Sequence, residues 1–251
     1  MNKKITNWKN KKVWLVGASD GIGAALAKKF LSEGVDLYVS SRRKEKLLDV
    51  VKGYSNATVL AFDVTDLSAA EEAIKQIPEL DLVIFMAADY SPMKSDNLDA
   101  KRAGQIVDVN LKGAINISSV AIEKFLKQKR GHLSLVASVA GFVGLPESSV
   151  YGATKAALIN FGESLAHDLK PLGLDISIVN PGFVKTRLTE KNEFDMPFIM
   201  TAEEAALEIF KGYGTGKFAI TFPFIFSLFF RTIRVLPYCL HFKMMKALVK
   251  T

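Results

Sequence analysis

The amino-acid sequence predicts a single-domain α/β fold, a doubly wound parallel sheet of about seven strands with helices on both faces. Two observations lead to this fold class. Short apolar runs rich in Val, Ile and Leu recur along the chain, and such runs are typical of strands buried on both faces of a parallel sheet. Amphipathic stretches separate them, as in βαβ units. The chain of 251 residues can build one substantial core, and no repeat or Pro/Gly-rich linker divides it.

The apolar runs give the expected strands in chain order. They cover residues 13–16, 37–39, 59–62, 82–85, 133–136, 176–179 and, as a seventh strand, 217–221. Between them, apolar residues recur at the three- and four-residue spacing of a helix that packs one face on a core. These expected helices cover residues 22–32, 67–76, 113–128 and 150–169.

Composition excludes several classes of protein. Hydrophobic residues at 49% and charged residues at 24% are typical of a globular chain. The net charge is +7, with basic clusters near both ends, but no basic patch interleaved with aromatic residues stands in the body, so we expect no nucleic-acid partner. The three histidines lie far apart without Cys or carboxylate neighbours at ligand spacing, and we expect no metal site.

The single cysteine, Cys239, excludes an internal disulfide and suits a reducing compartment. No apolar signal core precedes Val13, so no secretory signal peptide is visible. We therefore expect a cytoplasmic protein.

The first expected strand leads directly into a glycine-rich segment, residues 17–23, which reads Gly-Ala-Ser-Asp-Gly-Ile-Gly. A helix follows it. A helix N-terminus carries unpaired N–H groups and about half a positive charge, so it suits a pyrophosphate. Glycine is needed where the chain turns sharply or where a ligand touches the backbone. This G-x-x-x-G-x-G spacing predicts a dinucleotide site, with a plain strand-to-helix turn as the alternative.

The second expected strand ends at Ser40-Ser41-Arg42-Arg43, without a carboxylate. An acidic residue here would bind the 2′-hydroxyl of NAD, whereas a basic one accommodates the 2′-phosphate of NADP. We therefore expect NADP(H) rather than NAD(H), with Arg42 at the phosphate and Arg43 as a solvated residue at a helix start. Asp20 counts against this preference, because a carboxylate near that phosphate would repel it.

Tyr151 and Lys155 lie four residues apart on an expected helix, thirteen residues after Ser138, so the phenol and the ammonium share a face. A tyrosine that acts as a base near neutral pH needs its pKa lowered by roughly three units, or ~4 kcal/mol. A charge ~4 Å away supplies about that much at an effective dielectric constant of ~20, but not in bulk water. We expect a partly buried Lys155 to lower the pKa of Tyr151. A solvated helix face is the alternative.

Together these residues resemble the short-chain dehydrogenase/reductase family over about residues 12–210. The resemblance rests on motifs in the family's order: the glycine loop at Gly17, Gly21 and Gly23, then Asp63-Val64, Val109-Asn110-Leu111, Ser138, Tyr151 with Lys155, and Asn180-Pro181-Gly182 followed by Thr186. It implies a Rossmann-type fold, and because no linker divides the chain we expect residues 1–251 to form this single domain with its C-terminal extension. It also implies reversible hydride transfer between a nicotinamide cofactor and a carbonyl or hydroxyl group.

The resemblance implies a role for each matching residue. Tyr151 would be the general acid or base, and Lys155 would lower its pKa and bind the nicotinamide ribose. Ser138 would hydrogen-bond the substrate oxygen, and Asn110 would hold a water that links Lys155 to solvent. Asp63 and Val64 would contact the adenine, Ser19 and Ile22 the phosphates, and Thr186 the carboxamide. The implied cofactor contacts are Gly17, Ser19, Gly21, Ile22, Gly23, Arg42, Asp63, Val64, Ala88, Asn110, Tyr151, Lys155, Pro181, Gly182, Val184 and Thr186.

Some of these residues have structural alternatives, because Asp63 could cap a helix and Asn110 could form a bulge. The chain also departs from the family after the fourth strand. Phe85-Met86-Ala87-Ala88 stands where the family usually has Asn-Asn-Ala-Gly. Ala88 keeps a small residue near the cofactor, whereas we assign no cofactor contact to Phe85 or Met86.

Residues 185–212 are expected to form the substrate loop or lid. They include an apolar cluster of Phe194, Met196, Pro197, Phe198, Ile199 and Met200. The cluster would either close over an apolar pocket and exclude water or tether the loop to the core. The substrate is expected to be a small apolar alcohol or carbonyl compound.

Residues 224–251 are expected to form an apolar helical extension. The apolar run from Phe218 to Phe230 is shorter than the ~20 residues of a membrane span. Lys243, Lys246 and Lys250 form a cationic stripe beside apolar residues. The stripe would suit a peripheral contact with the inner face of a membrane, or a helix packed on its own core or on a second subunit.

The sequence therefore predicts an NADP(H)-dependent reductase or dehydrogenase. The family often pairs through helices that correspond to residues 113–128 and 150–169, so a homo-oligomer is expected. The competing hypothesis is a catalytically idle protein that senses the cofactor or scaffolds a complex. Such a protein usually lacks the tyrosine or the lysine, and this chain has both.

Overall fold

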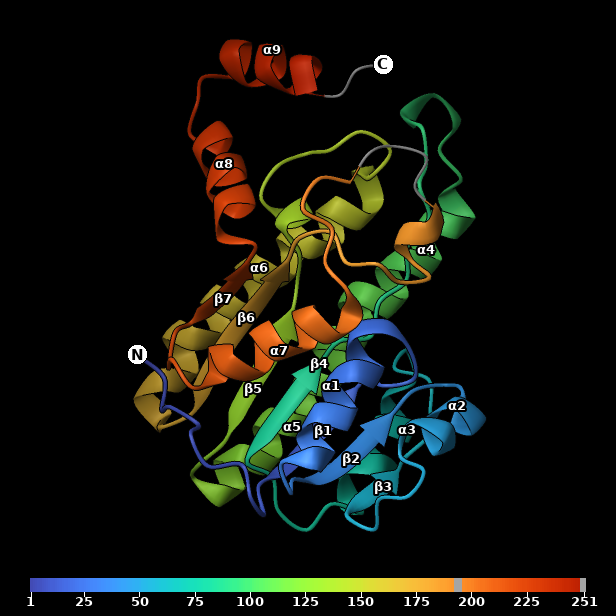
Figure 1. Cartoon of the computed structure of the whole chain (residues 1–251), viewed down its shortest axis with the longest axis vertical. Coiled ribbons are helices and arrows are strands. Elements are labelled where there is room, and N and C mark those ends of the chain that lie inside the picture. The colour runs from blue at the N-terminus through green and yellow to red at the C-terminus, as the bar shows by residue number, and fades with distance from the viewer. Residues whose placement is uncertain (192–195, 249–251) are drawn as a thin grey trace.

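A computed structural model describes residues 1–191 and 196–248 of the chain. Over these residues the core is one seven-stranded parallel sheet in the order β3-β2-β1-β4-β5-β6-β7 (Figure 1). The strands are β1 Lys12–Val16, β2 Asp36–Ser40, β3 Ala57–Val59, β4 Leu82–Phe85, β5 His132–Val136, β6 Asp175–Pro181 and β7 Ala219–Phe222. The doubly wound prediction is confirmed, and the order reverses between β1 and β4. In such sheets ligands bind beyond the carboxyl ends of the strands at this reversal.

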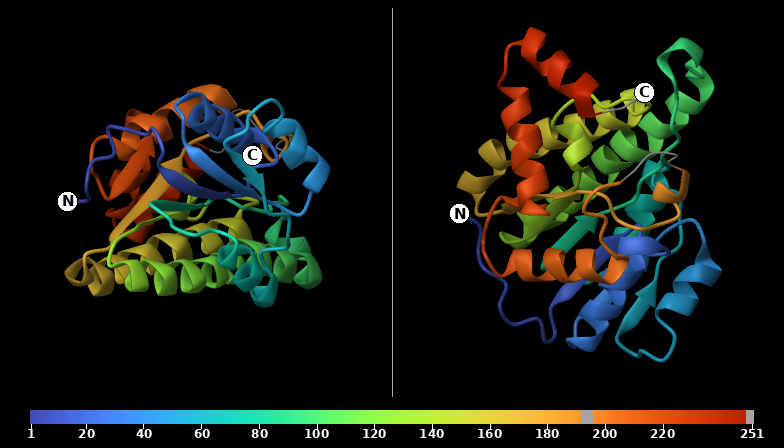
Figure 2. Two further views of the ribbon diagram at one scale, coloured as in Figure 1. Left: turned by 90° about the horizontal axis from the view of Figure 1, so that it is seen from below. Right: turned by 45° about the horizontal axis from the view of Figure 1, so that its top comes forward.

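Helices cover both faces of the sheet, as the view from below in Figure 2 shows. Consecutive residues of β1 point to opposite faces, since Val13 and Leu15 pack in one apolar cluster and Trp14 and Val16 in the other. One face carries α1 Gly21–Ser32, α2 Lys44–Val50 and α7 Ala202–Tyr213. The other carries α3 Leu67–Lys75, α4 Ala100–Val107, α5 Gly113–Gln128 and α6 Ser149–Leu169.

The strand boundaries differ from the prediction at the two edges of the sheet. The third strand is expected at residues 59–62 but lies at Ala57–Val59. Leu60 is nevertheless buried and Phe62 packs on Trp14, so the apolar pattern continues beyond the strand. At the other edge the strand lies at Ala219–Phe222 rather than at 217–221.

The segment expected to be a loop at residues 185–212 is divided in the structure. Its second part is α7, which begins with a capping box between Thr201 and Glu204. Ala205, Ala206 and Ile209 are buried in the same cluster as residues of α1. Residues 202–212 are therefore part of the packed core rather than of a loop.

Beyond β7 the chain forms α8 Phe224–Arg234 and α9 Tyr238–Leu248, so the extension is helical over its described residues. Figure 1 shows both helices standing clear of the sheet, at the end where the strands have their carboxyl ends. Within residues 1–191 and 196–248, none of the helices has the length and apolar character needed to cross a membrane. Lys250 and Val249 lie outside the described residues.

Candidate cofactor and active site

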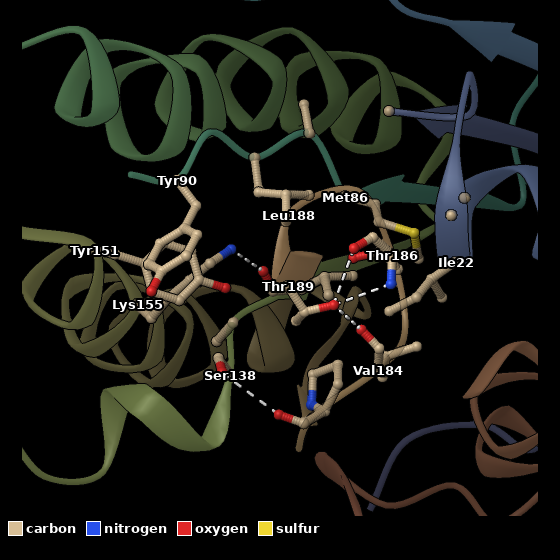
Figure 3. Close-up of a pocket in the computed structure, with 18 of the residues that line it drawn as sticks. Ile22, Met86, Tyr90, Ser138, Tyr151, Lys155, Val184, Thr186, Leu188 and Thr189 are labelled. Atoms are coloured by element: carbon tan, nitrogen blue, oxygen red, sulfur yellow. Dashed lines mark hydrogen bonds between the residues drawn. The ribbon is translucent and has the colours of Figure 1, made fainter. Parts of the chain in front are cut away.

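A cleft of about 290 Å³ opens at the carboxyl ends of the central strands (Figure 3). Tyr90, Tyr151 and Lys155 lie on one side of it, and Ile22, Met86 and Thr186 lie on the other. The structure brings together every predicted site residue except Asn110 along the lining of this cleft. The segments that meet there include the glycine loop, the residues that follow β2, β3, β4, β5 and β6, the first turns of α6, and α8.

The glycine loop has the geometry of a ligand cradle. Gly17 has a φ of +103°, and a Cβ there would lie 2.5 Å from the backbone nitrogen of Ala87. Gly21 has a φ of +50°, and a Cβ there would meet Thr186 at 2.9 Å. Neither position accepts a side chain without strain. The loop therefore brings its backbone and the first turn of α1 to the cleft, and these residues fit the pyrophosphate of a dinucleotide.

Asp20 is engaged by the protein itself. Its Oδ1 accepts a hydrogen bond from the nitrogen of Gly21 at 2.9 Å and so caps α1. Its Oδ2 lies 3.4 Å from Arg43, 3.6 Å from Arg187 and 4.0 Å from Lys46. Three cations therefore surround the carboxylate that counts against a bound 2′-phosphate, and they reduce that objection.

The two arginines after β2 occupy different places. Arg42 lies 3.7 Å from Asp63 with two thirds of its side chain exposed. Arg43 donates a hydrogen bond to Ser19 at 2.9 Å. It precedes α2, as expected of a residue at a helix start, but its guanidinium lies against the glycine loop rather than in solvent. The prediction that Arg43 is a solvated residue is wrong, and both arginines line the cleft.

Asp63 does not cap a helix. Its Oδ1 accepts hydrogen bonds from the backbone nitrogen and the hydroxyl of Thr65, both at 2.9 Å, whereas Asp66 caps α3. Asp63 and Val64 line the cleft. Met86 lines it too, which the sequence reasoning missed, while Phe85 is fully buried in β4.

Tyr151 and Lys155 share one face of α6, as predicted. Lys155 Nζ lies 5.5 Å from the centre of the Tyr151 ring and donates a hydrogen bond to the carbonyl of Val136 at 2.9 Å. Lys155 is only 2% exposed. Ser138, directly after β5, accepts a hydrogen bond from Ala140 at 3.1 Å and donates one to the carbonyl of Pro181 at 3.4 Å.

Burial dominates the protonation of this pair. It raises the pKa of Tyr151 to about 12, although the neighbouring Ser138 hydroxyl acts in the opposite direction. It lowers the pKa of Lys155 to about 7. Burial thus acts on the pKa of Tyr151 in the direction opposite to the effect expected of Lys155, and that effect stays a prediction. Tyr151 carries its proton at neutral pH, which is the state of a general acid.

Asn110 is fully buried behind the cleft, in a π-helical turn at Asp108–Lys112 between α4 and α5. Its side-chain nitrogen donates to the carbonyl of Asp89 at 3.0 Å and to the hydroxyl of Thr154 at 3.1 Å. Its side-chain oxygen accepts from the nitrogen of Asp89 at 2.7 Å. Asn110 thus joins the segment after β4 to α6, next to Lys155. Its expected role in holding a water stays a prediction.

Tyr90 is a site residue that the sequence reasoning missed. Its ring meets that of Tyr151 edge to face, with 5.0 Å between centroids, and burial raises its pKa. Asp89 next to it forms an ion pair with Arg102, which anchors this segment to α4. The sequence feature that indicates this residue is its place five residues after the end of β4, at the edge of the sheet where the cleft opens.

Part of the cleft lining is apolar. It consists of Tyr90, Leu145, Phe183, Leu188, Phe226 and Phe230. Phe226 and Phe230 come from α8 and contact each other with 4.8 Å between ring centroids. The inner face of α8 therefore lines the cleft, in agreement with the expectation that the extension packs on it.

The apolar cluster at residues 194–200 is divided. Met200 packs against the core, and its backbone pairs with Phe183 and Lys185, so it tethers the segment. Phe198 and Ile199 are exposed, at 62% and 43%. Residues 196–200 do not line the cleft, and Leu188 and Thr189 do. Phe194 lies outside the described residues.

Comparison with known proteins agrees with this geometry. The family model for short chain dehydrogenases matches residues 11–196. A protein of Myxococcus xanthus, described as an uncharacterized oxidoreductase, is 35% identical over 231 residues, which are 89% of this chain and 91% of that protein.

Solved structures share the fold. A short chain dehydrogenase from Burkholderia cenocepacia in complex with NADP superposes with a TM-score of 0.85 at 21% identity, over 95% of this chain and 98% of that one. A short chain dehydrogenase/reductase from Burkholderia phymatum in complex with NAD gives 0.83 at 21% identity, over 90% and 94%. Because the family model covers most of the chain and the Myxococcus relative nearly all of it, the chain belongs to the short-chain dehydrogenase/reductase family of oxidoreductases.

Proposed function

We propose that the protein is an NADP(H)-dependent oxidoreductase that interconverts a carbonyl and a hydroxyl group on a small apolar molecule. One observation carries the proposal. Ser138, Tyr151 and Lys155 line the same cleft as the glycine loop, so a substrate oxygen near the phenol would lie in reach of a dinucleotide held by that loop.

Each residue has a defined part in this reaction. A bound nicotinamide cofactor supplies or accepts the hydride. In reduction Tyr151 gives its phenolic proton to the substrate oxygen, and in oxidation it takes that proton back. Ser138 hydrogen-bonds the same oxygen and stabilises the charge that develops on it. Lys155 binds the ribose and, in its protonated form, places positive charge near the phenol. Asn110 positions α6 through Thr154.

The preference for NADP(H) rests on this chain's own residues, because the relatives of solved structure include complexes with NAD and with NADP. Two arginines and no carboxylate follow β2. Asp20 lies within 4.0 Å of three cations, which offset its charge. Arg42 remains the proposed ligand of the 2′-phosphate. Arg43, which donates to Ser19, joins it as a second candidate.

The apolar substrate is supported by the aromatic and aliphatic side chains that line the same cleft as Tyr151. Such a lining favours an apolar group on the reacting carbon and excludes water from the chemistry. The shape of this lining does not single out one molecule.

We also propose a cytoplasmic protein that forms a homo-oligomer. The exposed thiol of Cys239 suits a reducing compartment. On α5, Ile115 and Leu126 are exposed apolar residues available to a second subunit.

The test combines two measurements on the purified protein. Tryptophan fluorescence titration gives the affinities for NADPH and NADH, and a panel of apolar aldehydes, ketones and quinones is scored for NADPH consumption. We expect tighter binding of NADPH and turnover of some members of the panel. Binding of NADPH without consumption across the panel would instead favour the idle scaffold or sensor.

A further inference from the structure

The net charge of the chain is concentrated at its C-terminal end. Residues 209–251 contain no Asp or Glu and seven Lys or Arg, which equals the net charge of +7 of the whole chain. The preceding residues are thus neutral overall. A segment whose charged side chains are all positive attracts a negatively charged partner and repels a second copy of itself.

Helix α8 has two apolar faces. Its inner face buries Phe226, Phe230 and Ile233 in a cluster with residues that follow β5. Its outer face leaves Phe224 71% exposed and Ile225 73% exposed. A helix that is apolar on both faces has one face to bury on something beyond its own domain.

Helix α9 extends this exposed surface. Of its side chains from Tyr238 to Lys246, only His241 and Met245 are buried. His241 lies 3.3 Å from the carbonyl of Ile233, and Met245 packs in the cluster under α8. Tyr238 and Phe242 stack on each other in the open, at 5.9 Å between ring centroids.

Four cations flank the apolar side chains, and they are of two kinds. Arg231 lies over the ring of Phe142 at 4.9 Å, and Arg234 donates to the carbonyl of Phe142 at 2.8 Å, so both hold α8 to the domain. Lys243 and Lys246 are exposed on α9, and no ion pair among the described residues involves them. These two lysines are available to a partner.

A second copy of this chain fits the surface poorly. A twofold contact places the same patch on both subunits. It would bring the lysines of α9 against a segment that offers them no carboxylate. An anionic lipid surface supplies what the patch lacks. Aromatic and aliphatic side chains enter the boundary between headgroups and acyl chains, while lysines reach the phosphates.

We propose that α8 and α9 dock the protein peripherally on an anionic lipid bilayer. Phe224, Ile225 and the α9 aromatic pair would enter the interface, with Lys243 and Lys246 at the headgroups. The docking is independent of catalysis. Because α8 also lines the cleft with Phe226 and Phe230, docking brings the substrate end of the cleft to the lipid. This last step, which makes the substrate a lipid-soluble alcohol or carbonyl compound, rests on the proposed function.

Flotation of the purified protein with vesicles tests the docking without measuring turnover. Vesicles of phosphatidylcholine alone are compared with vesicles that also contain phosphatidylglycerol, at low and high salt. We expect flotation with the anionic vesicles only, weakening as salt screens the lysines. Lys243→Glu with Lys246→Glu should reduce partitioning by roughly tenfold or more. Phe224→Ser with Ile225→Ser should reduce it at every salt concentration.

The matched control is Lys28→Glu with Lys52→Glu, which makes the same change of charge at exposed positions on and after helices near β2. It should float like the wild type. Circular dichroism and NADPH binding confirm that each variant is folded.

Absence of flotation at low salt, or an equal loss in the control, would overturn the proposal. A dimer that dissociates in the Phe224/Ile225 variant without any vesicle binding would overturn it in favour of a second copy. If the protein consumes NADPH but never floats with vesicles, the docking proposal is rejected and the proposed reaction stands.

Discussion

Lys155 and Tyr151 lie one helical turn apart on α6, and the lysine ammonium is directed at the carbonyl of Val136 rather than at the phenol. Burial separates their protonation behaviour, since it raises the pKa of Tyr151 to about 12 and lowers that of Lys155 to about 7. Burial therefore favours the uncharged form of both groups, the protonated phenol of Tyr151 and the neutral amine of Lys155. This arrangement suits proton delivery during reduction.

Tyr151→Phe tests the proton donor. It removes one hydroxyl and keeps the ring against Tyr90, so the fold and the cofactor affinity should remain. The rate of NADPH consumption on a substrate identified from the panel should fall by roughly 10²- to 10⁴-fold. Stopped-flow measurement of kcat beside a fluorescence titration of NADPH separates the two effects. Wild-type turnover in this variant would show that another group supplies the proton.

Lys155→Met tests the cost of burying the ammonium. The folded-state pKa lies below the unfolded one, so the unfolded state binds the proton more tightly. Burying the ammonium therefore lowers the free energy of unfolding. This destabilisation is complete below about pH 7 and disappears as pH rises toward 10.5. It amounts to at most about 5 kcal/mol, and the lost hydrogen bond to Val136 offsets part of it.

The Lys155→Met variant should therefore be inactive yet more stable than the wild type by about 1–3 kcal/mol at pH 6. Urea unfolding at pH 6 and pH 9.5 measures the difference, which should shrink at the higher pH. A variant that is less stable at both pH values would contradict this account of the lysine.

The choice of cofactor depends on the arginines after β2. Arg42→Asp should weaken NADP(H) binding by roughly tenfold or more and NAD(H) binding far less, because a charge-assisted contact becomes a repulsion. Arg43→Asp should have the larger effect if the phosphate lies beside Ser19, and it also loses the existing contact with that hydroxyl. Fluorescence titration of both variants with both cofactors decides between the two positions. Equal affinities of the wild type for NADPH and NADH would reject the preference itself.

Much of the fold follows from local pattern. Val, Ile and Leu runs located five strands closely and overlapped β3 at Val59 only, while the expected seventh strand at 217–221 overlaps β7. The glycine spacing located the loop whose backbone borders the cleft. The pattern does not fix where β3 ends. Leu60 and Phe62 belong to an apolar cluster on one face of the sheet, although neither residue is part of the strand. The expected loop at 185–212 includes most of α7, although the capping box of Thr201 and Glu204 is a helix signal in the sequence.

The site was harder to derive where it depends on tertiary position. The order of Arg42 and Arg43 along the chain does not say which guanidinium faces the glycine loop. Nor does a Y-x-x-x-K spacing reveal how deeply both groups are buried, and burial is what sets their pKa values. Tyr90 carries no local pattern of its own and reaches Tyr151 only because β4 ends beside α6.

His132 provides a stability test far from the cleft. It is 6% exposed at the start of β5, and its Nε2 lies 2.9 Å from the hydroxyl of Ser177. Burial lowers its pKa to about 4, despite the opposing effect of Asp175. An unfolded histidine has a pKa near 6.5, so the unfolded state takes up the proton first as pH falls. The contribution to stability is complete above about pH 6.5 and is lost as pH falls toward 4.

Complete loss of this contribution lowers the free energy of unfolding by roughly 3 kcal/mol. Urea unfolding of the wild type at pH 7.5 and pH 5 should show part of it as a decrease in the free energy of unfolding. His132→Phe keeps a ring against Tyr213 and leaves Ser177 bonded to Ser134, so the variant should fold and show a smaller decrease. His167, which is exposed on α6, gives the control His167→Phe, for which the wild-type decrease should remain. If both variants respond to pH like the wild type, other groups govern the acid sensitivity of this protein.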